Sequence, residues 1–224
     1  MRVGDFVWAA AIAAVIALFA IPASATVVLD LTARYPYPLG FTKFALLATM
    51  GELLVLRLGK GTWSMPAGLW AKVLVWGIVG ILVVLMFTLF NAGVMAAGAK
   101  GLLPQGEGWV GNLLVAFWTS AIMNLTFGPV FMAAHRISDA WIEARFGRKA
   151  LGSGTWPQRD EVVASVDWKR FLDFVIGRTI PLFWIPAHTI TFLLPAGYRI
   201  VVAAFLSIAL GVILTWGKRA TVMK

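Results

Sequence analysis

The chain has 224 residues, of which 60% are hydrophobic, and its mean hydropathy is +0.86. Soluble domains contain only ~45–50% apolar residues, so this composition indicates an integral membrane protein. The net charge of +9 would suggest a nucleic-acid partner in a soluble protein. Here the basic residues lie between apolar runs, so membrane orientation is the better explanation and no nucleic-acid partner is expected. The absence of cysteine excludes disulfides, thiol catalysis and cysteine-ligated metals.

Apolar runs predict an all-α integral membrane protein, a single domain over residues 1–224 built as a bundle of about six transmembrane or membrane-embedded helices. Most runs reach the ~20 residues that a helix needs to cross a ~30 Å hydrocarbon core. Turn-like segments such as RYPYPLG and KGLLPQGEG separate them. The expected spans are 7–29, 38–58, 69–97, 109–134, 171–194 and 200–216.

The first run has an alternative interpretation as a signal peptide. Arg2 precedes an apolar stretch, and the sequence PASA, which ends at Ala25, resembles a cleavage site. The apolar character continues to Leu31, which favours a retained span. Cleavage of residues 1–25 would leave the topology of the remaining spans unchanged.

The distribution of Lys and Arg predicts the orientation of the spans. Segment 135–170 is expected to be a cytoplasmic amphipathic helix followed by a loop. With six spans and both termini inside, only Arg34, Lys43, Lys100 and Arg199 lie outside and Arg178 lies in the membrane. The inner side then holds Arg2, Arg57, Lys60, Lys72, Arg136, Arg145, Arg148, Lys149, Arg159, Lys169, Arg170, Lys218, Arg219 and Lys224. Positive-inside bias favours this arrangement over one in which 171–187 stays inside.

Polar residues inside the expected spans are the candidate functional residues. At ~1.5 Å per residue, Glu52 lies roughly 9 Å and Arg178 roughly 10 Å from the inner end of their spans. Asn124 lies at about 15 Å on the same arithmetic. Because an ionised group near mid-bilayer costs ~2.5–3.5 kcal/mol, Glu52 and Arg178 are expected to form an ion pair with Asn124 nearby. Snorkelling of Arg178 to lipid phosphate is the alternative.

His188 and Asn91 form a second polar level, toward the outer side. Pro181 and Pro186 each remove a backbone donor from the fifth span, which is therefore expected to be broken and to face the bundle interior. Water is expected to reach His188 from outside. The alternative is a dry, fully packed His188 that is bonded to a neighbouring backbone, in a merely kinked helix whose hydroxyl groups bond back to its own backbone.

Catalytic and cofactor motifs are scarce. His135 and Asp139 are four residues apart and could hold a metal or a proton, but two possible ligands do not define a metal site. A helix cap with an ion pair is the better interpretation. No phosphate-binding glycine pattern or catalytic triad is evident, so we expect neither a cofactor nor an enzyme.

Two segments, FGPVFMAAHRISDAWI at 127–142 and the stretch 183–216, resemble signatures of the Mpv-seventeen and twenty-two-kilodalton peroxisomal membrane protein family, closest to bacterial members. Ala134 and His135 stand where that family has an aromatic pair, and Thr191 stands where it has Asn. The matching positions are Gly51, Gly128, Pro129, His135, Asp139, Trp184, Pro186, Phe192, Pro195, Arg199 and Trp216. The resemblance implies a multi-span protein with channel-like passage of small solutes.

Two classes of function remain open. The first is a small-solute pathway lined by Glu52, Asn91, Asn124, Arg178 and His188. The second is a structural or accessory membrane subunit in which these groups only hold helices together. The expected partners are the lipid bilayer, small solutes, and further copies or other subunits of a membrane complex. A bacterial inner membrane, with both termini cytoplasmic, is the expected location.

Overall fold

The computed structural model describes residues 2–147 and 156–222, with side chains described as far as Thr215, and every regular element in these ranges is helical. The described residues include five helices that are long and apolar enough to cross a membrane. The architecture is therefore the all-helical one predicted, with five such helices where the sequence predicts about six. They are α1 (Val3–Ala20), α3 (Pro36–Lys60), α4 (Leu69–Ala99), α5 (Gly108–Phe146) and α9 (Ala196–Val222).

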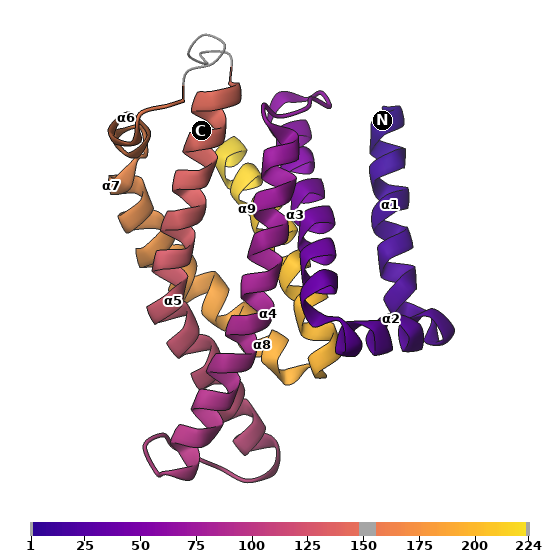
Figure 1. Cartoon of the computed structure of the whole chain (residues 1–224), viewed down its shortest axis with the longest axis vertical. Coiled ribbons are helices and arrows are strands. Elements are labelled where there is room, and N and C mark those ends of the chain that lie inside the picture. Colours follow the sequence, from indigo (N-terminus) through magenta and orange to yellow (C-terminus); the bar gives the residue numbers. More distant parts are fainter. Residues whose placement is uncertain (1, 148–155, 223–224) are drawn as a thin grey trace.

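The long helices run antiparallel from one end of the molecule to the other (Figure 1). The turn 61–68, helix α6 (Arg159–Ala164) and the start of α1 lie at one end, which we call the α6 end. Helix α2 (Pro22–Arg34) and the turn 100–107 lie toward the other, the α2 end. The C-terminal end of α9 returns to the α6 end, so α1 begins and α9 ends on the same side of the molecule.

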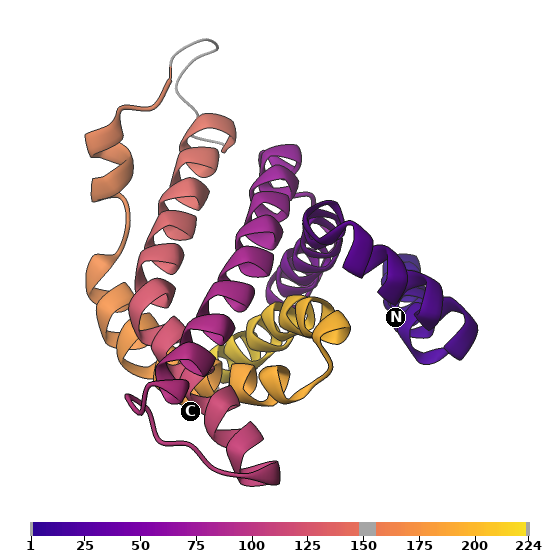
Figure 2. The ribbon, with the colours of Figure 1, turned by 60° about the horizontal axis from the view of Figure 1, so that its bottom comes forward.

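Helices α1 and α2 form an arm at one side of the bundle (Figure 2). Pro22 stands in the first turn of α2, after the extended backbone of Ile21, so the predicted run 7–29 is divided between two helices. Helix α2 lies across the direction of α1 and α3 (Figure 1). The arm is attached to the bundle by Trp8, whose Nε1 donates to the Met50 carbonyl at 3.0 Å.

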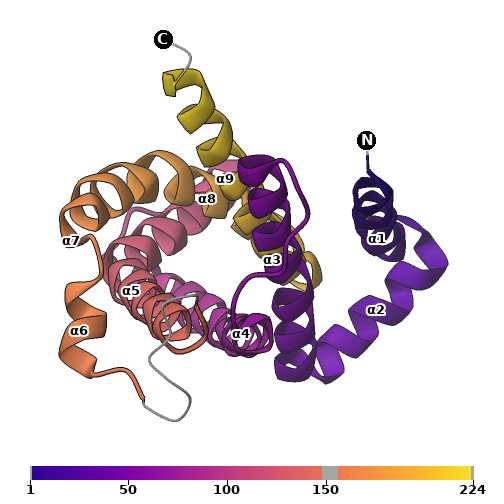
Figure 3. The same cartoon turned by 90° about the horizontal axis from the view of Figure 1, so that it is seen from above.

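The bundle proper surrounds a core contributed by α3, α4, α5, α8 (Ile185–Leu193) and α9 (Figure 3). Small residues let these helices approach closely. A Cβ on Gly80 of α4 would overlap the Gly40 carbonyl of α3, and a Cβ on Gly51 would lie 3.1 Å from Ile208 of α9. The buried residues of this core are Phe44, Leu47, Val79, Phe87, Ala116, Met123, Phe192, Ile200, Val201, Ala203, Ala204 and Ile208.

Helix α5 is longer than the sequence analysis predicts. It runs without interruption through Pro129 and through 135–146, which was expected to be a separate interfacial helix. No glycine or proline lies between 130 and 146, so nothing in the sequence ends the helix there. The rest of the predicted loop contains α6 and α7 (Trp168–Arg170), while 148–155 lies outside the described residues.

The predicted fifth span, 171–194, consists of two helices of different geometry. A π-helix, η1 (Phe171–Trp184), passes directly into α8 at Ile185. The Ile185 N–H donates to the Ile180 carbonyl five residues earlier, which is the hydrogen-bond spacing of a π-helix. The chain stays helical through Pro181 and Pro186, so a break at these prolines is not confirmed. The helix ends at Leu193, shortly before Pro195.

We expect Gly80→Ala to destabilise the protein, because the added methyl group would meet the backbone of Gly40, which has no flexible side chain to move aside. Overpacking of this kind typically costs ~1–3 kcal/mol, and rigid backbone on the other side puts this case at the upper end. Thermal unfolding in detergent would measure the loss. Gly93→Ala on the same helix is the control, since nothing lies within 4 Å of its added Cβ. Equal midpoints for the two variants would contradict the close contact.

Single introduced cysteines test the orientation in intact cells. Lys60 and Gln158 are exposed at the α6 end, and Lys100 is exposed at the turn of the other end. Because positive-inside bias puts the α6 end in the cytoplasm, a membrane-impermeant maleimide should label Lys100→Cys and spare Lys60→Cys and Gln158→Cys. The reverse pattern would invert the topology. The chain has no native cysteine to interfere.

Candidate functional site

An ion-pair cluster joins three helices near the α6 end. Lys72 of α4 lies 3.1 Å from Oε2 of Glu52 on α3 and 3.3 Å from Oδ1 of Asp139 on α5, measured from its Nζ. These side chains retain only 14%, 21% and 24% of their accessible surface. The single ammonium therefore neutralises charge on two neighbouring helices at once.

Two aromatic residues complete this cluster, which we call the Lys72 cluster: Glu52, Lys72, Trp76, His135 and Asp139. Trp76 Nε1 donates to Glu52 Oε1 at 2.9 Å. The Trp76 and His135 ring centroids are 4.3 Å apart, and His135 Nε2 lies 3.8 Å from Asp139 Oδ2. His135 Nδ1 is buried and makes no hydrogen bond within the described part of the chain.

The net charge of the Lys72 cluster changes when His135 gains or loses a proton. Two carboxylates face one ammonium, so the group carries one negative charge when His135 is neutral and none when it is protonated. The position between the carboxylates, which a metal cation would take, is filled by the Lys72 ammonium. No group of three His, Cys, Asp or Glu side chains that could hold a metal occurs among the described residues. The arrangement suits charge neutralisation and proton exchange.

The expected ion pair between Glu52 and Arg178 is wrong. Glu52 is paired with Lys72, and Arg178 is exposed with no hydrogen bond or ion pair to any described residue. Its neighbours Thr179 and Ile180 are buried, so Arg178 lies on the outward face of η1. Depth along a span gives the height of a residue but not the face of the helix on which it lies.

Asn124 belongs to a second polar group rather than to the neighbourhood of Glu52. It precedes Asp139 by fifteen residues on the same helix, roughly 22 Å along its axis. The Asn124 amide nitrogen and oxygen lie 3.1 and 3.3 Å from His188 Nδ1. The Ser120 hydroxyl donates to the Ile185 carbonyl at 2.7 Å. These contacts attach α5 to α8 at the level where the sequence places His188.

Aromatic rings enclose His188. Its ring stacks on Trp184 with centroids 5.1 Å apart and meets the edge of Phe87 at 5.4 Å. The histidine is partly buried and is bonded to a side chain rather than to a neighbouring backbone. Thr189 and Thr191 do donate to carbonyls of their own helix, as the packed alternative requires. Access of water to His188 stays a prediction.

Asn91 is the remaining candidate from the sequence. Its amide lies 3.4 Å from the hydroxyl of the fully buried Thr119, which links α4 to α5. Asn91 also lines a pocket of about 430 Å³ at the α2 end, between α2, α3, α4 and α9. The same pocket is lined by Lys43 and Arg199.

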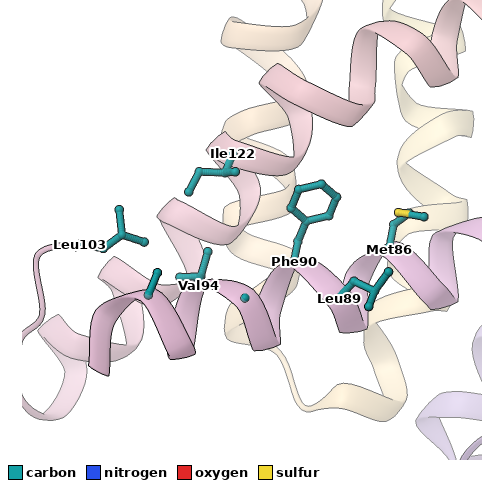
Figure 4. Close-up of a pocket in the computed structure, with 8 residues that line it drawn as sticks. Met86, Leu89, Phe90, Val94, Leu103 and Ile122 are labelled. Atoms are coloured by element: carbon teal, nitrogen blue, oxygen red, sulfur yellow. The ribbon is translucent and has the colours of Figure 1, made fainter. Parts of the chain in front are cut away.

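A second hollow, between α4 and α5, is entirely apolar (Figure 4). Phe90 and Val94 of α4 face Ile122 of α5, and Leu103 of the connecting turn closes one side. Its volume is about 440 Å³. Because none of its lining residues can hydrogen-bond through a side chain, it suits acyl chains and not a polar solute.

The motif positions from the family resemblance mostly serve packing. A Cβ on Gly51 would lie 3.1 Å from Ile208 of α9, and one on Gly128 would lie 3.6 Å from Ile180. The Phe192 ring packs at a tilt against Phe87 in the core, with centroids 4.7 Å apart. Pro129 is accommodated inside α5, Pro186 lies in the first turn of α8, and Pro195 follows its end. His135 and Asp139 lie in the Lys72 cluster, and Trp184 beside His188. The side chain of Trp216 lies outside the described part.

Sequence reasoning counted Lys72 and Lys43 only toward orientation and missed their interactions. Both are cations inside predicted apolar runs, which was the available signal. It also missed the bidentate pair at the α6 end, in which Arg57 Nε and Nη2 lie 2.8 and 3.0 Å from the Asp5 carboxylate. Trp63 Nε1 donates to the same carboxylate at 2.9 Å. These contacts hold the start of α1 against the end of α3.

No model of a known family, no curated protein and no solved structure matches the chain. The family resemblance therefore stays a prediction, and function has to be argued from the site.

Replacing Lys72 tests the energetic role of the cluster. Lys72→Met leaves Glu52 and Asp139 without their shared counter-charge, so the loss of stability should approach the ~3–5 kcal/mol typical of a broken buried pair. Adding Glu52→Gln and Asp139→Asn should restore much of it, since no charge is then stranded. Unfolding midpoints in detergent would measure both variants, with Lys100→Met, an exposed lysine directly after α4, as the control. A triple variant no more stable than Lys72→Met would contradict the interpretation.

Proposed function

We propose that the protein provides a pathway for small solutes across a membrane, with the Lys72 cluster as its charged constriction. One observation carries the proposal: three ionisable side chains converge from α3, α4 and α5, all of which are long and apolar enough to span. Charged groups in spans are costly, and they commonly mark solute, ion or proton pathways.

The second polar group supports a continuous route. Ser120 and Asn124 lie on α5, which also carries Asp139, and with His188 of α8 they form a polar group further toward the α2 end. Asn91 with Thr119 extends the polar positions to the pocket there. Phe87 and Trp184 flank His188, so this state of the route is narrow and closed by rings. The proposed solutes are accordingly small.

The remaining features of the proposal come from the sequence. The resemblance to the Mpv-seventeen and twenty-two-kilodalton peroxisomal membrane protein family implies channel-like passage. Six crossings follow if η1 and α8 together count as one, and both termini then lie in the cytoplasm of a bacterial inner membrane. No catalytic role or cofactor is proposed.

A structural or accessory subunit is the second candidate, and a specific observation favours it. Glu52, Lys72 and Asp139 already satisfy one another, as Asn124 and His188 do, so these contacts also explain how the helices are held together. In that case the protein would be recovered with fixed partners or as further copies of itself.

Flux through proteoliposomes separates the two functions. Purified protein in liposomes should release entrapped potassium, chloride or small polyols faster than empty liposomes do. Glu52→Gln should change the rate severalfold, because it removes one negative charge from the constriction and leaves Lys72 paired with Asp139 alone. Glu161→Gln, the same change at an exposed position of α6, should leave the rate unchanged.

Impermeable liposomes, or rates that Glu52→Gln leaves unaltered, would contradict the pathway. Recovery of such an impermeable protein in a fixed complex would support the structural role.

A further inference from the structure

Lys43 and Arg199, two cations at the α2 end, have no carboxylate partner among the described residues. Lys43 is 8% exposed, and its ammonium makes one hydrogen bond, to the Thr32 hydroxyl at 2.7 Å. Arg199 donates through Nε to the Leu194 carbonyl at 2.9 Å. Neither residue forms an ion pair with any described carboxylate. The buried cation pairs of Arg57 and Lys72 show that the fold supplies carboxylates elsewhere.

Aromatic rings and hydroxyls provide only partial compensation. The Lys43 ammonium lies 5.5 Å from the Phe19 ring centroid, and the Arg199 guanidinium 5.6 Å from that of Phe192. Neither terminal nitrogen of the Arg199 guanidinium makes a hydrogen bond to a described residue. A cation held away from water without a counter-charge is costly, so a bound anion would lower the free energy of this region.

Both cations line the same pocket, of about 430 Å³, and no Asp or Glu lines it. Among the other polar lining groups, Thr32 and Thr88 donate their hydroxyl protons to the Val28 and Val84 carbonyls, so the Asn91 amide is the remaining side-chain donor. The rest of the wall is apolar and includes Leu29, Pro36, Met95 and Ile200. The chemistry therefore suits a molecule with an anionic head and an apolar body.

The position of the pocket indicates where that molecule comes from. Helix α2 contributes three lining residues and runs across the spanning helices, while its Asp30 and Arg34 pair on its exposed face. A short helix across the bundle with one polar face is the arrangement of an interfacial helix. The pocket thus lies at the level of lipid headgroups.

From this geometry we infer that the pocket binds the phosphate group of an acidic phospholipid, held by Lys43 and Arg199 with its acyl chains along the apolar wall. The pocket lies at the opposite end from the Lys72 cluster and shares Asn91 with the proposed solute pathway. The test measures retained lipid and not flux, so failure of the lipid inference and failure of the pathway are distinguishable.

Retained lipid is the first measurement. Protein reconstituted in equal parts of phosphatidylglycerol and phosphatidylcholine, then extracted in mild detergent, should retain phosphatidylglycerol above its input share, as quantified by mass spectrometry. Lys43→Gln and Arg199→Gln should each reduce this enrichment roughly fivefold, the effect expected for one basic residue at an anionic membrane surface. Lys43→Arg should keep it, and so should Lys100→Gln, an exposed lysine at the same end. Unchanged enrichment in a Lys43→Gln, Arg199→Gln double variant would overturn the inference.

Stability separates lipid binding from a merely structural role. Lys43→Met removes an uncompensated cation, so in phosphatidylcholine its unfolding midpoint should equal or exceed that of the wild type, whereas phosphatidylglycerol should no longer raise it. A midpoint that falls by the same amount in both lipids would mark Lys43 as structural and overturn the inference.

Inorganic phosphate is the other source of a phosphate group that Lys43 and Arg199 could bind. If it displaces phosphatidylglycerol and stabilises the protein equally, the site takes a free anion and the lipid assignment fails.

Discussion

A charge placed among apolar helices has to be neutralised nearby, and the arrangement of α3, α4 and α5 depends on this constraint. Glu52 and Asp139 approach the single Lys72 ammonium from neighbouring helices, so this one cation is shared as the counter-charge of two carboxylates. The three-way ion pair specifies one rotation and one register for all three helices.

The two ends of the bundle neutralise their cations in different ways. At the α6 end, Arg57 and Lys72 have carboxylates from other helices. At the α2 end, Lys43 and Arg199 face hydroxyl groups, carbonyl groups and rings. Binding at the α2 end would therefore add a missing charge, whereas opening the α6 end would require separating charges already paired. In our two proposals, lipid recognition therefore belongs to the α2 end and gating to the α6 end.

Much of the fold could be predicted because span length and hydropathy are local properties of the sequence. The runs 38–58, 69–97 and 200–216 each lie within one long helix. The division of 7–29 at Pro22 and the π geometry of 171–184 were harder to predict, because they depend on backbone hydrogen bonds that composition does not reveal. Glu52 was correctly identified as a residue that needs a partner. The partner, Lys72, was not identified, because counting residues gives the height of a residue within a span but not the face of the helix on which it lies.

The pairing of Glu52 with Lys72 also has a consequence for the insertion of the helices into the membrane during synthesis. The two residues belong to successive helices joined by the short turn 61–68, so they form a hairpin that the ribosome completes before it makes α5. Glu52 or Lys72 alone would be an unpaired charge in lipid, but together these two side chains form a neutral pair, and Gly40 against Gly80 brings the two backbones together. Asp139 arrives later and finds an ammonium already in position. The inserted α3–α4 hairpin thus presents the Lys72 ammonium to which Asp139 of the newly made α5 can bind.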